Sequence, residues 1–312
     1  MMAMPYRYAY LGPAGTFSEA AVNALSGGGQ SAAVPFPTIQ AALDAVRAGA
    51  VDRAVVPIEN SVEGAVTATL DELAAGQDLV ICAELLLDVA FALLVRPGTR
   101  LPDVKLVGGH PVAQPQCRRW LAANLPDAEW RPALSNAEAA RQVADGQLDA
   151  ALAGAFTADV YGLALLASDI HDRDSAVTRF VVVRLPGPLP PVTSADRTSV
   201  IAFLADDHPG ALMEILSQFA VRGVNLTRIE SRPTGEGLGR YCFFIDCEGH
   251  VGEARVGEAL MGLRRICAEV RFLGSYSRSD GGRTQVRAGT SDVAFADAGA
   301  WLARLRDGRT AS

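Results

Sequence analysis

Thr178 and Arg179 stand at the start of the stretch A-V-T-R-F-V-V-V, whose apolar second half is typical of a buried strand in a parallel sheet. Because side chains alternate along a strand, the hydroxyl and the guanidinium point to opposite faces. A hydroxyl donates and accepts hydrogen bonds, and a guanidinium binds a carboxylate through two parallel hydrogen bonds. The two side chains therefore serve different parts of one site, or Arg179 has only a structural role.

A second polar group, Glu59, Asn60 and Ser61, follows the apolar strand of D-R-A-V-V-P-I-E-N-S. Open α/β sheets bind ligands at the carboxyl ends of their parallel strands, so these side chains lie where a ligand is expected. The alternative is that Asn60 and Ser61 only cap the following helix.

A glycine-containing turn, G-P-A-G-T-F-S-E, leads from a strand into a helix near the N-terminus. Thr16 and Glu19 match a capping box at this helix start. The free N–H groups of a helix N-terminus suit an anion. An anion site and an ordinary tight turn with a cap explain these residues equally well.

The glycine-rich stretch G-G-H-P-V-A-Q-P-Q-C opens another helix and carries Gln116 near the start of that helix. An amide side chain donates and accepts hydrogen bonds without a charge to desolvate, which suits an oxygen-rich ligand. Cys117 and His110 suggest a nucleophile and its base, but a half-buried cysteine on an apolar helix face is the favoured interpretation.

The elements that must position these residues change their order at a proline-rich linker, residues 186–197. Before the linker, short apolar strands alternate with alanine-rich helical patterns, which predicts an α/β domain with parallel sheets. After it, the order strand, helix, strand, strand, helix, strand over residues 198–276 predicts a ferredoxin-like βαββαβ domain. The polar, glycine-rich tail, residues 277–312, is expected to be largely disordered, with a short helix over residues 295–305.

Composition and charge exclude several classes of protein. The net charge is −7, Lys105 is the only lysine, and no basic cluster suits a nucleic acid. The five cysteines form no C-x-x-C pair, so neither a zinc site nor a disulfide framework is expected, and a reduced cytoplasmic setting fits best. No apolar run reaches the roughly 18 residues of a membrane span, and the N-terminus lacks the apolar core of a signal peptide. We expect neither a metal nor another cofactor.

Four stretches occur together in the order typical of one family. They are Y-L-G-P-A-G-T-F-S-E-A-A, V-P-I-E-N-S-V-E-G-A-V, H-P-V-A-Q-P-Q-C and T-R-F-V-V-V. Through them the span from Tyr6 to Tyr276 resembles the prephenate dehydratases, which convert prephenate to phenylpyruvate in phenylalanine biosynthesis. The resemblance implies a two-lobed, periplasmic-binding-protein-like catalytic domain over residues 6–185. Its active site would lie in the cleft between the lobes, with the second lobe at about residues 81–152.

The same resemblance implies roles for the polar residues. The expected catalytic residues are Thr178, Gln116 and Asn60, and the expected substrate-binding residues are Thr16, Glu59, Ser61 and Arg179. A threonine hydroxyl is too weak an acid to protonate the leaving hydroxyl alone. The proton therefore comes from water relayed through the threonine, or from Glu59 if burial raises its pKa.

One position departs from the family pattern. Gly109 stands where many relatives carry a serine or threonine before H-P, so a hydroxyl sometimes counted in the site is missing. Either that group is dispensable, or Ser61 or a water molecule replaces it.

The stretches G-A-L-M-E-I-L and G-V-N-L-T-R-I-E-S-R-P resemble an ACT domain of the phenylalanine-sensing type. The resemblance implies that phenylalanine acts as an allosteric effector by favouring one state of lobe closure. It also implies a homodimer or homotetramer formed through the ACT and catalytic domains. Two alternatives stay open, an arogenate dehydratase and a non-catalytic amino-acid sensor. The residues expected near the effector are Gly210, Ala211, Leu212, Asn225 and Glu230.

Overall fold

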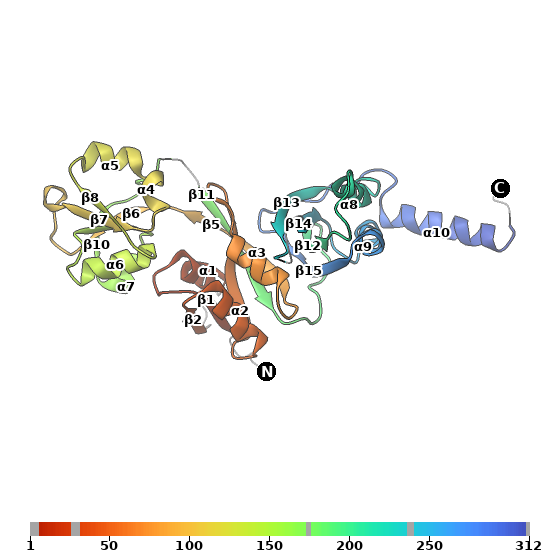
Figure 1. Cartoon of the computed structure of the whole chain (residues 1–312), viewed down its shortest axis with the longest axis horizontal. Helices are drawn as coiled ribbons and strands as arrows, with labels where there is room; N and C mark the ends of the chain where they lie inside the picture. Colours follow the sequence, from red (N-terminus) through yellow and green to blue (C-terminus); the bar gives the residue numbers. More distant parts are fainter. Residues whose placement is uncertain (1–5, 26–31, 173–175, 236–239, 310–312) are drawn as a thin grey trace. The chain divides into compact units, whose positions relative to one another are not determined.

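The computed structural model describes residues 6–25, 32–172, 176–235 and 240–309 (Figure 1). The chain divides into two compact units, one of residues 1–69 with 85–183 and one of residues 70–84 with 184–312. The strands form three sheets, of which two belong mainly to the first unit and one to the second.

The first sheet has the strand order β2-β1-β3-β11-β5, and the short β4 pairs with β3. β1 runs parallel to β2 and β3, but β11 is antiparallel to β3. The prediction that the strand of Thr178 belongs to a parallel pair is therefore wrong for this pairing. The chain reaches β11 from the second sheet rather than through a crossover helix, so nothing fixes a parallel direction. The strands are β1 (Arg7–Leu11), β2 (Ala32–Phe36), β3 (Arg53–Asn60), β4 (Gly64–Ala65), β5 (Val80–Val89) and β11 (Ala176–Arg184).

Three helices accompany this sheet, α1 (Phe17–Leu25), α2 (Ile39–Arg47) and α3 (Thr67–Ala74). α2 is one of the alanine-rich helical segments that precede the linker. Its N-cap Thr38 accepts a hydrogen bond from the backbone N–H of Ala41 at 3.0 Å, which satisfies one of the free donors at the helix start.

The second sheet has the strand order β10-β6-β9-β7-β8. Its strands run from Ala92 to Ala167, whereas β5, which starts at Val80, belongs to the first sheet. The predicted limits of the second lobe, residues 81–152, therefore differ from the limits of this sheet. The elements are β6 (Ala92–Val95), η1 (Leu101–Asp103), β7 (Leu106–Gly109), α4 (Ala113–Gln116), α5 (Arg118–Asn124), β8 (Glu129–Pro132), α6 (Asn136–Ala144), β9 (Ala150–Ala153), α7 (Thr157–Tyr161) and β10 (Ala164–Ala167).

The second unit contains the predicted βαββαβ order, with the antiparallel sheet β13-β14-β12-β15. An apolar core that includes Val200, Ile215, Phe219 and Ile245 joins the sheet to its two helices. This order confirms the ferredoxin-like fold. The elements are β12 (Asp196–Phe203), α8 (Ala211–Ala220), β13 (Leu226–Pro233), β14 (Tyr241–Glu248), α9 (Ala254–Ile266) and β15 (Glu269–Ser277).

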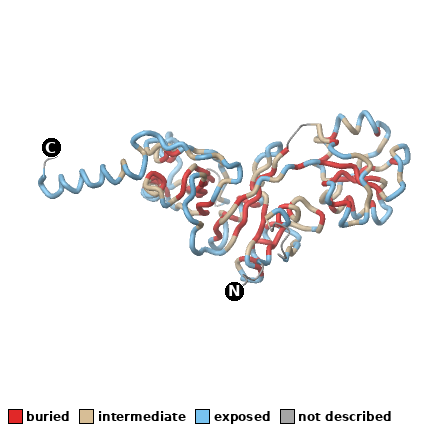
Figure 2. Tube along the Cα trace, turned by 180° about the vertical axis from the view of Figure 1, so that it is seen from behind, coloured by how far each residue is buried: buried red, intermediate tan, exposed pale blue. Residues whose placement is uncertain are grey.

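The tail is more ordered than predicted. The backbone N–H groups of Arg278 and Thr284 donate to the carbonyl groups of Ala195 and Ser194 at 2.7 and 3.1 Å. The predicted short helix lies within α10 (Asp292–Arg306), which has no buried residue and is exposed over most of its length (Figure 2). Composition alone does not reveal these backbone contacts, since they depend on where the end of β15 lies.

Candidate active site

Asn60 and Thr178 face each other across the pair of strands β3 and β11. The side-chain Nδ2 of Asn60 donates a hydrogen bond to Thr178 Oγ1 at 2.8 Å. Asn60 Oδ1 accepts hydrogen bonds from the backbone N–H groups of Val62 and Glu63 at 2.8 and 2.9 Å. Three contacts therefore fix the amide and, through it, the threonine hydroxyl.

The direction of that hydrogen bond decides what Thr178 can do. Its side chain is buried, and its oxygen accepts from Asn60. A hydroxyl has one proton to donate, and in the part of the chain that the structure describes no acceptor takes this proton. The Thr178 hydroxyl therefore has a proton that no described residue accepts.

Ser61 holds the ends of the same two strands together. Its backbone N–H donates to the carbonyl oxygen of Val177 at 2.9 Å, and its Oγ accepts from the backbone N–H of Val177 at 2.9 Å. The alternative that Asn60 and Ser61 cap the next helix is wrong, because α3 starts only at Thr67 and both side chains bond elsewhere.

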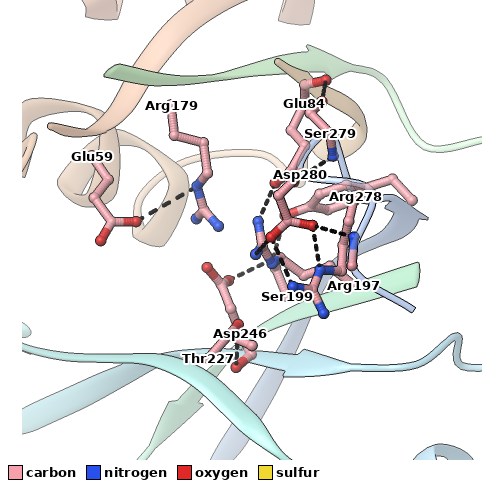
Figure 3. Close-up of polar contacts among 12 residues, drawn as sticks. Glu59, Glu84, Arg179, Arg197, Ser199, Thr227, Asp246, Arg278, Ser279 and Asp280 are labelled. Carbon is pink, nitrogen blue, oxygen red and sulfur yellow. Dashed lines mark hydrogen bonds and ion pairs between the residues drawn. The ribbon is translucent and has the colours of Figure 1, made fainter. Parts of the chain in front are cut away.

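Glu59 and Arg179 form the neighbouring pair on these strands (Figure 3). The Glu59 Oε2 atom lies 3.7 Å from Arg179 Nε, and the side chains are 42% and 7% exposed. The hypothesis that Glu59 is the proton donor required burial of its carboxyl group, which the structure does not show. Arg179 is a buried, ion-paired group beside the threonine.

A cavity of about 640 Å³ is lined by chain neighbours of this group, although Asn60 and Thr178 are not themselves among its lining residues. Its volume lies within the range of small-molecule sites. Its wall includes Gln116 together with Val62 and Glu63, which follow Asn60 and Ser61 in the chain. The full lining consists of Val62, Glu63, Pro115, Gln116, Arg118, Arg119, Ala122, His171, Asp172 and Ala176.

Three basic side chains of this cavity were missed by the sequence reasoning, Arg118, Arg119 and His171. No ion pair joins either guanidinium to another residue in the described ranges. The carboxylate of Asp172 is bound by backbone instead: the N–H of Arg119 is shared between its two oxygens, both at 3.0 Å. Two free guanidinium groups suit a ligand with carboxylates.

The predicted residue Gln116 keeps part of its hydrogen-bonding capacity for a ligand. Its Nε2 donates to the carbonyl oxygen of Val112 at 3.2 Å. Its backbone carbonyl accepts from the N–H of Asp172 at 2.6 Å, which joins α4 to the segment before β11. No partner of Gln116 Oε1 is found among the described residues.

Thr16 lies at a different cavity, of about 610 Å³, which also includes His110 and Asn136. The Thr16 hydroxyl donates to the carbonyl oxygen of Leu11 at 3.1 Å and accepts from the N–H of Glu19 at 3.4 Å. Glu19 Oε2 in turn accepts from the N–H of Gly15 at 2.6 Å, close to the predicted capping box. The structure therefore does not bring Thr16 together with Thr178 in one cavity.

The interpretation of Cys117 and His110 as nucleophile and base is excluded by their surroundings. Cys117 lies fully buried in the apolar core of the second sheet, while His110 lines the cavity of Thr16. Burial, with a smaller effect of Asp172, raises the pKa of the Cys117 thiol to about 12. The thiol therefore stays protonated and unreactive near neutral pH.

Gly109 leaves no room for the missing hydroxyl residue. A Cβ atom at this position would lie 2.8 Å from Trp130 Cη2 and 3.4 Å from Asn136 Oδ1. The indole ring fills the space, and Asn136 Oδ1 accepts from the backbone N–H of His110 at 2.8 Å. Trp130 therefore packs where the side chain of a larger residue at position 109 would lie.

The residues expected at the effector site fall into two places. Gly210 is the N-cap of α8 with φ of 96°, Ala211 and Leu212 follow it, and Ala211 lines a cavity of about 190 Å³. Asn225 precedes β13 and Glu230 lies within this edge strand. Neither residue lines that small cavity.

Two further observations concern the whole described chain. Over the residues that are described, no three His, Cys, Asp or Glu side chains lie in a group able to hold a metal ion. Within the same ranges, every helix is too short or too polar to span a membrane.

The chain is similar to known proteins along almost its full length. A Mycobacterium tuberculosis (strain H37Rv) protein, Prephenate dehydratase, is 49% identical over 311 residues, which cover 97% of this chain and 95% of the relative. The structure of a prephenate dehydratase in complex with L-Phe from Arthrobacter aurescens is 49% identical, with a TM-score of 0.93 over 96% of this chain and 99% of that chain.

A more distant structure has another description. GqqA, a novel type of quorum quenching acylase, is 29% identical, with a TM-score of 0.78 over 88% of this chain and 98% of that chain. Two family matches divide the present sequence, Prephenate dehydratase over residues 8–187 and ACT domain over residues 199–265. With a two-lobed α/β catalytic domain of the periplasmic-binding-protein type and a ferredoxin-like second domain, the chain belongs to the prephenate dehydratase family.

Proposed function

We propose that this chain converts prephenate to phenylpyruvate at Thr178, Asn60 and the 640 Å³ cavity beside them. The observation that carries the proposal is the 2.8 Å hydrogen bond from Asn60 to Thr178. Because Thr178 Oγ1 accepts this bond, its proton is left for donation to a leaving oxygen. Gln116 lies in the wall of the same cavity and supplies an uncharged donor and acceptor.

Binding of the substrate has to balance two negative charges. Prephenate carries two carboxylates and a ring hydroxyl, and this chain has a net charge of −7. Arg118 and Arg119 provide local positive charge in the cavity, and the guanidinium fork matches a carboxylate. Local basic groups therefore outweigh the overall sign of the charge.

The bond changes need little from the protein beyond placement and one proton. The ring loses its carboxylate as carbon dioxide, and the electron pair of that bond enters the ring. The carbon–oxygen bond breaks, and the hydroxide takes its electron pair and a proton to leave as water. We assign the hydrogen bond to the leaving oxygen to Thr178, with the proton relayed through it from water, because this bond strengthens as negative charge develops.

The other predicted residues support this site rather than touching the leaving group. Ser61 fastens the ends of β3 and β11, and Arg179 neutralises Glu59 beside them. Thr16 caps α1 at the second cavity, where the helix N-terminus suits a carboxylate if the lobes close on the substrate. These roles follow from the bonds that each side chain already makes.

Regulation by phenylalanine follows from the second domain. The related Arthrobacter aurescens structure contains L-Phe, and it covers 96% of this chain at 49% identity. We place the effector at Gly210, Ala211, Leu212, Asn225 and Glu230 of a homodimer or homotetramer, in which a partner domain completes a site that one chain leaves divided. The setting that suits this biosynthetic reaction is the cytoplasm.

The test is the formation of phenylpyruvate, read by its absorbance in alkali after purified protein is mixed with prephenate at neutral pH. Turnover well above the spontaneous rate supports the proposal. Competition between prephenate and arogenate then identifies the preferred substrate. A rate at background with both substrates would instead favour the non-catalytic sensor.

A further inference from the structure

Residues 70–84, called the linking segment below, contain most of α3 and the first residues of β5, and they follow β3, which carries Asn60 of the catalytic pair Asn60 and Thr178. On the N-terminal side, Thr69 Oγ1 donates to the carbonyl oxygen of Pro57 at 2.6 Å, which ties the start of α3 to β3. On the C-terminal side, β5 pairs with β11, the strand of Thr178. The linking segment itself nevertheless forms one compact unit with the ACT domain.

An arginine of the ACT sheet holds the end of α3. Arg271, in β15, donates from Nη1 to the carbonyl oxygens of Leu73 and Ala74 at 3.3 and 2.7 Å. The last carbonyls of a helix have no partner within the helix, and α3 has no basic residue in its own last turn. Arg271 Nε also lies 3.4 Å from Asp78 Oδ1, further along the linking segment. The cap of this catalytic-domain helix is thus supplied by the ACT domain.

A second arginine binds the same helix from the other edge of the sheet. Arg232, in β13, donates from Nε and Nη2 to the two carboxylate oxygens of Asp71, both at 2.9 Å. Such a two-point bond fixes orientation as well as distance. A movement of β13 relative to β15 would therefore turn or shift α3.

A buried carboxylate anchors the middle of β5, at the end of the linking segment. Glu84 is 1% exposed and pairs with Arg197 of β12, which is 8% exposed (Figure 3). Its Oε1 also accepts from the backbone N–H of Ser279 at 3.1 Å. A buried charge is costly unless it is paired and hydrogen-bonded, so Glu84 cannot leave this position without breaking the pair.

The backbone of β5 also packs directly on β15. Gly274 has φ of 138°, and a Cβ atom there would lie 2.2 Å from the carbonyl oxygen of Ile81. Only glycine permits this approach together with this backbone conformation. The linking segment is therefore held at both ends and along its backbone by the ACT sheet.

We infer that the linking segment transmits the state of the ACT domain to the catalytic pair. A change of the ACT sheet on effector binding moves α3 and β5 through Arg232, Arg271 and Glu84. α3 is tied to β3 through Thr69, and β5 pairs with β11. A movement of α3 and β5 therefore changes the hydrogen bond between Asn60 and Thr178. This inference rests on the proposed function, since it takes phenylalanine as the effector and prephenate turnover as one readout.

The test uses the exposed pair of Arg232 with Asp71, whose loss should not prevent folding. Asp71→Asn removes the charge and keeps the shape. Its matched control is Glu258→Gln, which neutralises the acid partner of Arg222 at 3.6 Å without touching the linking segment. For Asp71→Asn we expect an unchanged phenylalanine affinity by calorimetry, a basal rate within about twofold, and inhibition weakened at least about fivefold, the lower range of typical allosteric coupling. Glu258→Gln should leave all three values unchanged.

A second readout is independent of activity. Hydrogen–deuterium exchange of residues 57–84 should change on addition of phenylalanine in the wild type and change much less in Asp71→Asn. If the wild type does not turn over prephenate, the proposed function fails while this readout still decides the inference. The inference would be overturned if the wild type and Asp71→Asn showed equal inhibition by phenylalanine and equal hydrogen–deuterium exchange. It would also be overturned if Glu258→Gln weakened the inhibition as much as Asp71→Asn does.

Discussion

Replacing Asn60 by aspartate should redirect the proton of Thr178. In the wild type, Asn60 Nδ2 donates to Thr178 Oγ1, while Asn60 Oδ1 accepts from Val62 and Glu63. A carboxylate can still accept from both backbone N–H groups, but it cannot donate to the hydroxyl. Thr178 would donate to the carboxylate instead, and its proton would no longer be available to the leaving oxygen.

The expected loss follows from the cost of removing one preorganised donor. Such a loss lowers kcat by about 10² to 10³, or about 3 kcal/mol. The added charge also repels a dianionic substrate, so KM should rise as well, and kcat is therefore the informative constant. Because both backbone contacts of the turn are kept, the thermal unfolding midpoint should change by only a few degrees.

The assay is steady-state formation of phenylpyruvate by Asn60→Asp, with Ser61→Ala as the matched control. Ser61→Ala removes the acceptor of the Val177 N–H in the same turn but leaves Thr178 untouched. We expect it to cost about 1 kcal/mol of stability and to keep kcat within a few-fold. A kcat for Asn60→Asp equal to that of Ser61→Ala would refute the assigned direction of the hydrogen bond.

Three further predictions concern other parts of the catalytic domain. Arg119→Gln should raise the KM for prephenate about tenfold or more with a smaller change in kcat, and equal KM values would remove Arg119 from the carboxylate site. Gly109→Ser should lower the free energy of unfolding by about 1 to 3 kcal/mol because its Cβ would lie 2.8 Å from Trp130, and a variant as stable as the wild type in urea titrations would contradict this packing. Cys117, whose pKa burial raises to about 12, should resist iodoacetamide at pH 8 until the protein is unfolded, and rapid labelling of the native thiol would contradict its burial. The folded state binds the Cys117 proton more tightly than the unfolded state does, so this residue's contribution to stability is complete below about pH 8.5 and falls as the pH rises toward 12.

The sequence allowed the strand ends of the site to be predicted, but not their partners. Asn60 is a polar residue just after an apolar run, and Thr178 is a polar residue just before one. Their contact depends on antiparallel pairing of strands 118 positions apart, which no local pattern specifies. Alternation likewise separated Arg179 from Thr178, but it could not show that Glu59 lies opposite the arginine.

The sequence did not predict the residues that come together only in the folded chain. Arg118, Arg119 and His171 come from two separate segments of the chain, and only the folded cavity brings them beside Gln116. The tail was misjudged for a similar reason, because Arg278 and Thr284 find backbone partners in the linker that composition does not predict. The second sheet continues to Ala167 through β10, a strand of four residues with little alternation, so its pairing with β6 could not be predicted from the sequence.

The relatives also show why activity has to be measured. A structure 29% identical to this chain is described as a quorum quenching acylase, so a similar fold occurs in a protein with a different described activity. Fold alone does not decide function, whereas the arrangement of a site does. The relevant arrangement here is the hydroxyl of Thr178 held by Asn60.

The most direct test of the central claim is the single-turnover rate of phenylpyruvate formation by Thr178→Val beside Thr178→Ser. Valine keeps the shape of the side chain without the hydroxyl, and serine keeps the hydroxyl. We expect the valine variant to lose at least about 10²-fold in rate and the serine variant to retain a substantial part of the rate. A valine variant that reacts within a few-fold of the wild type would contradict the central claim.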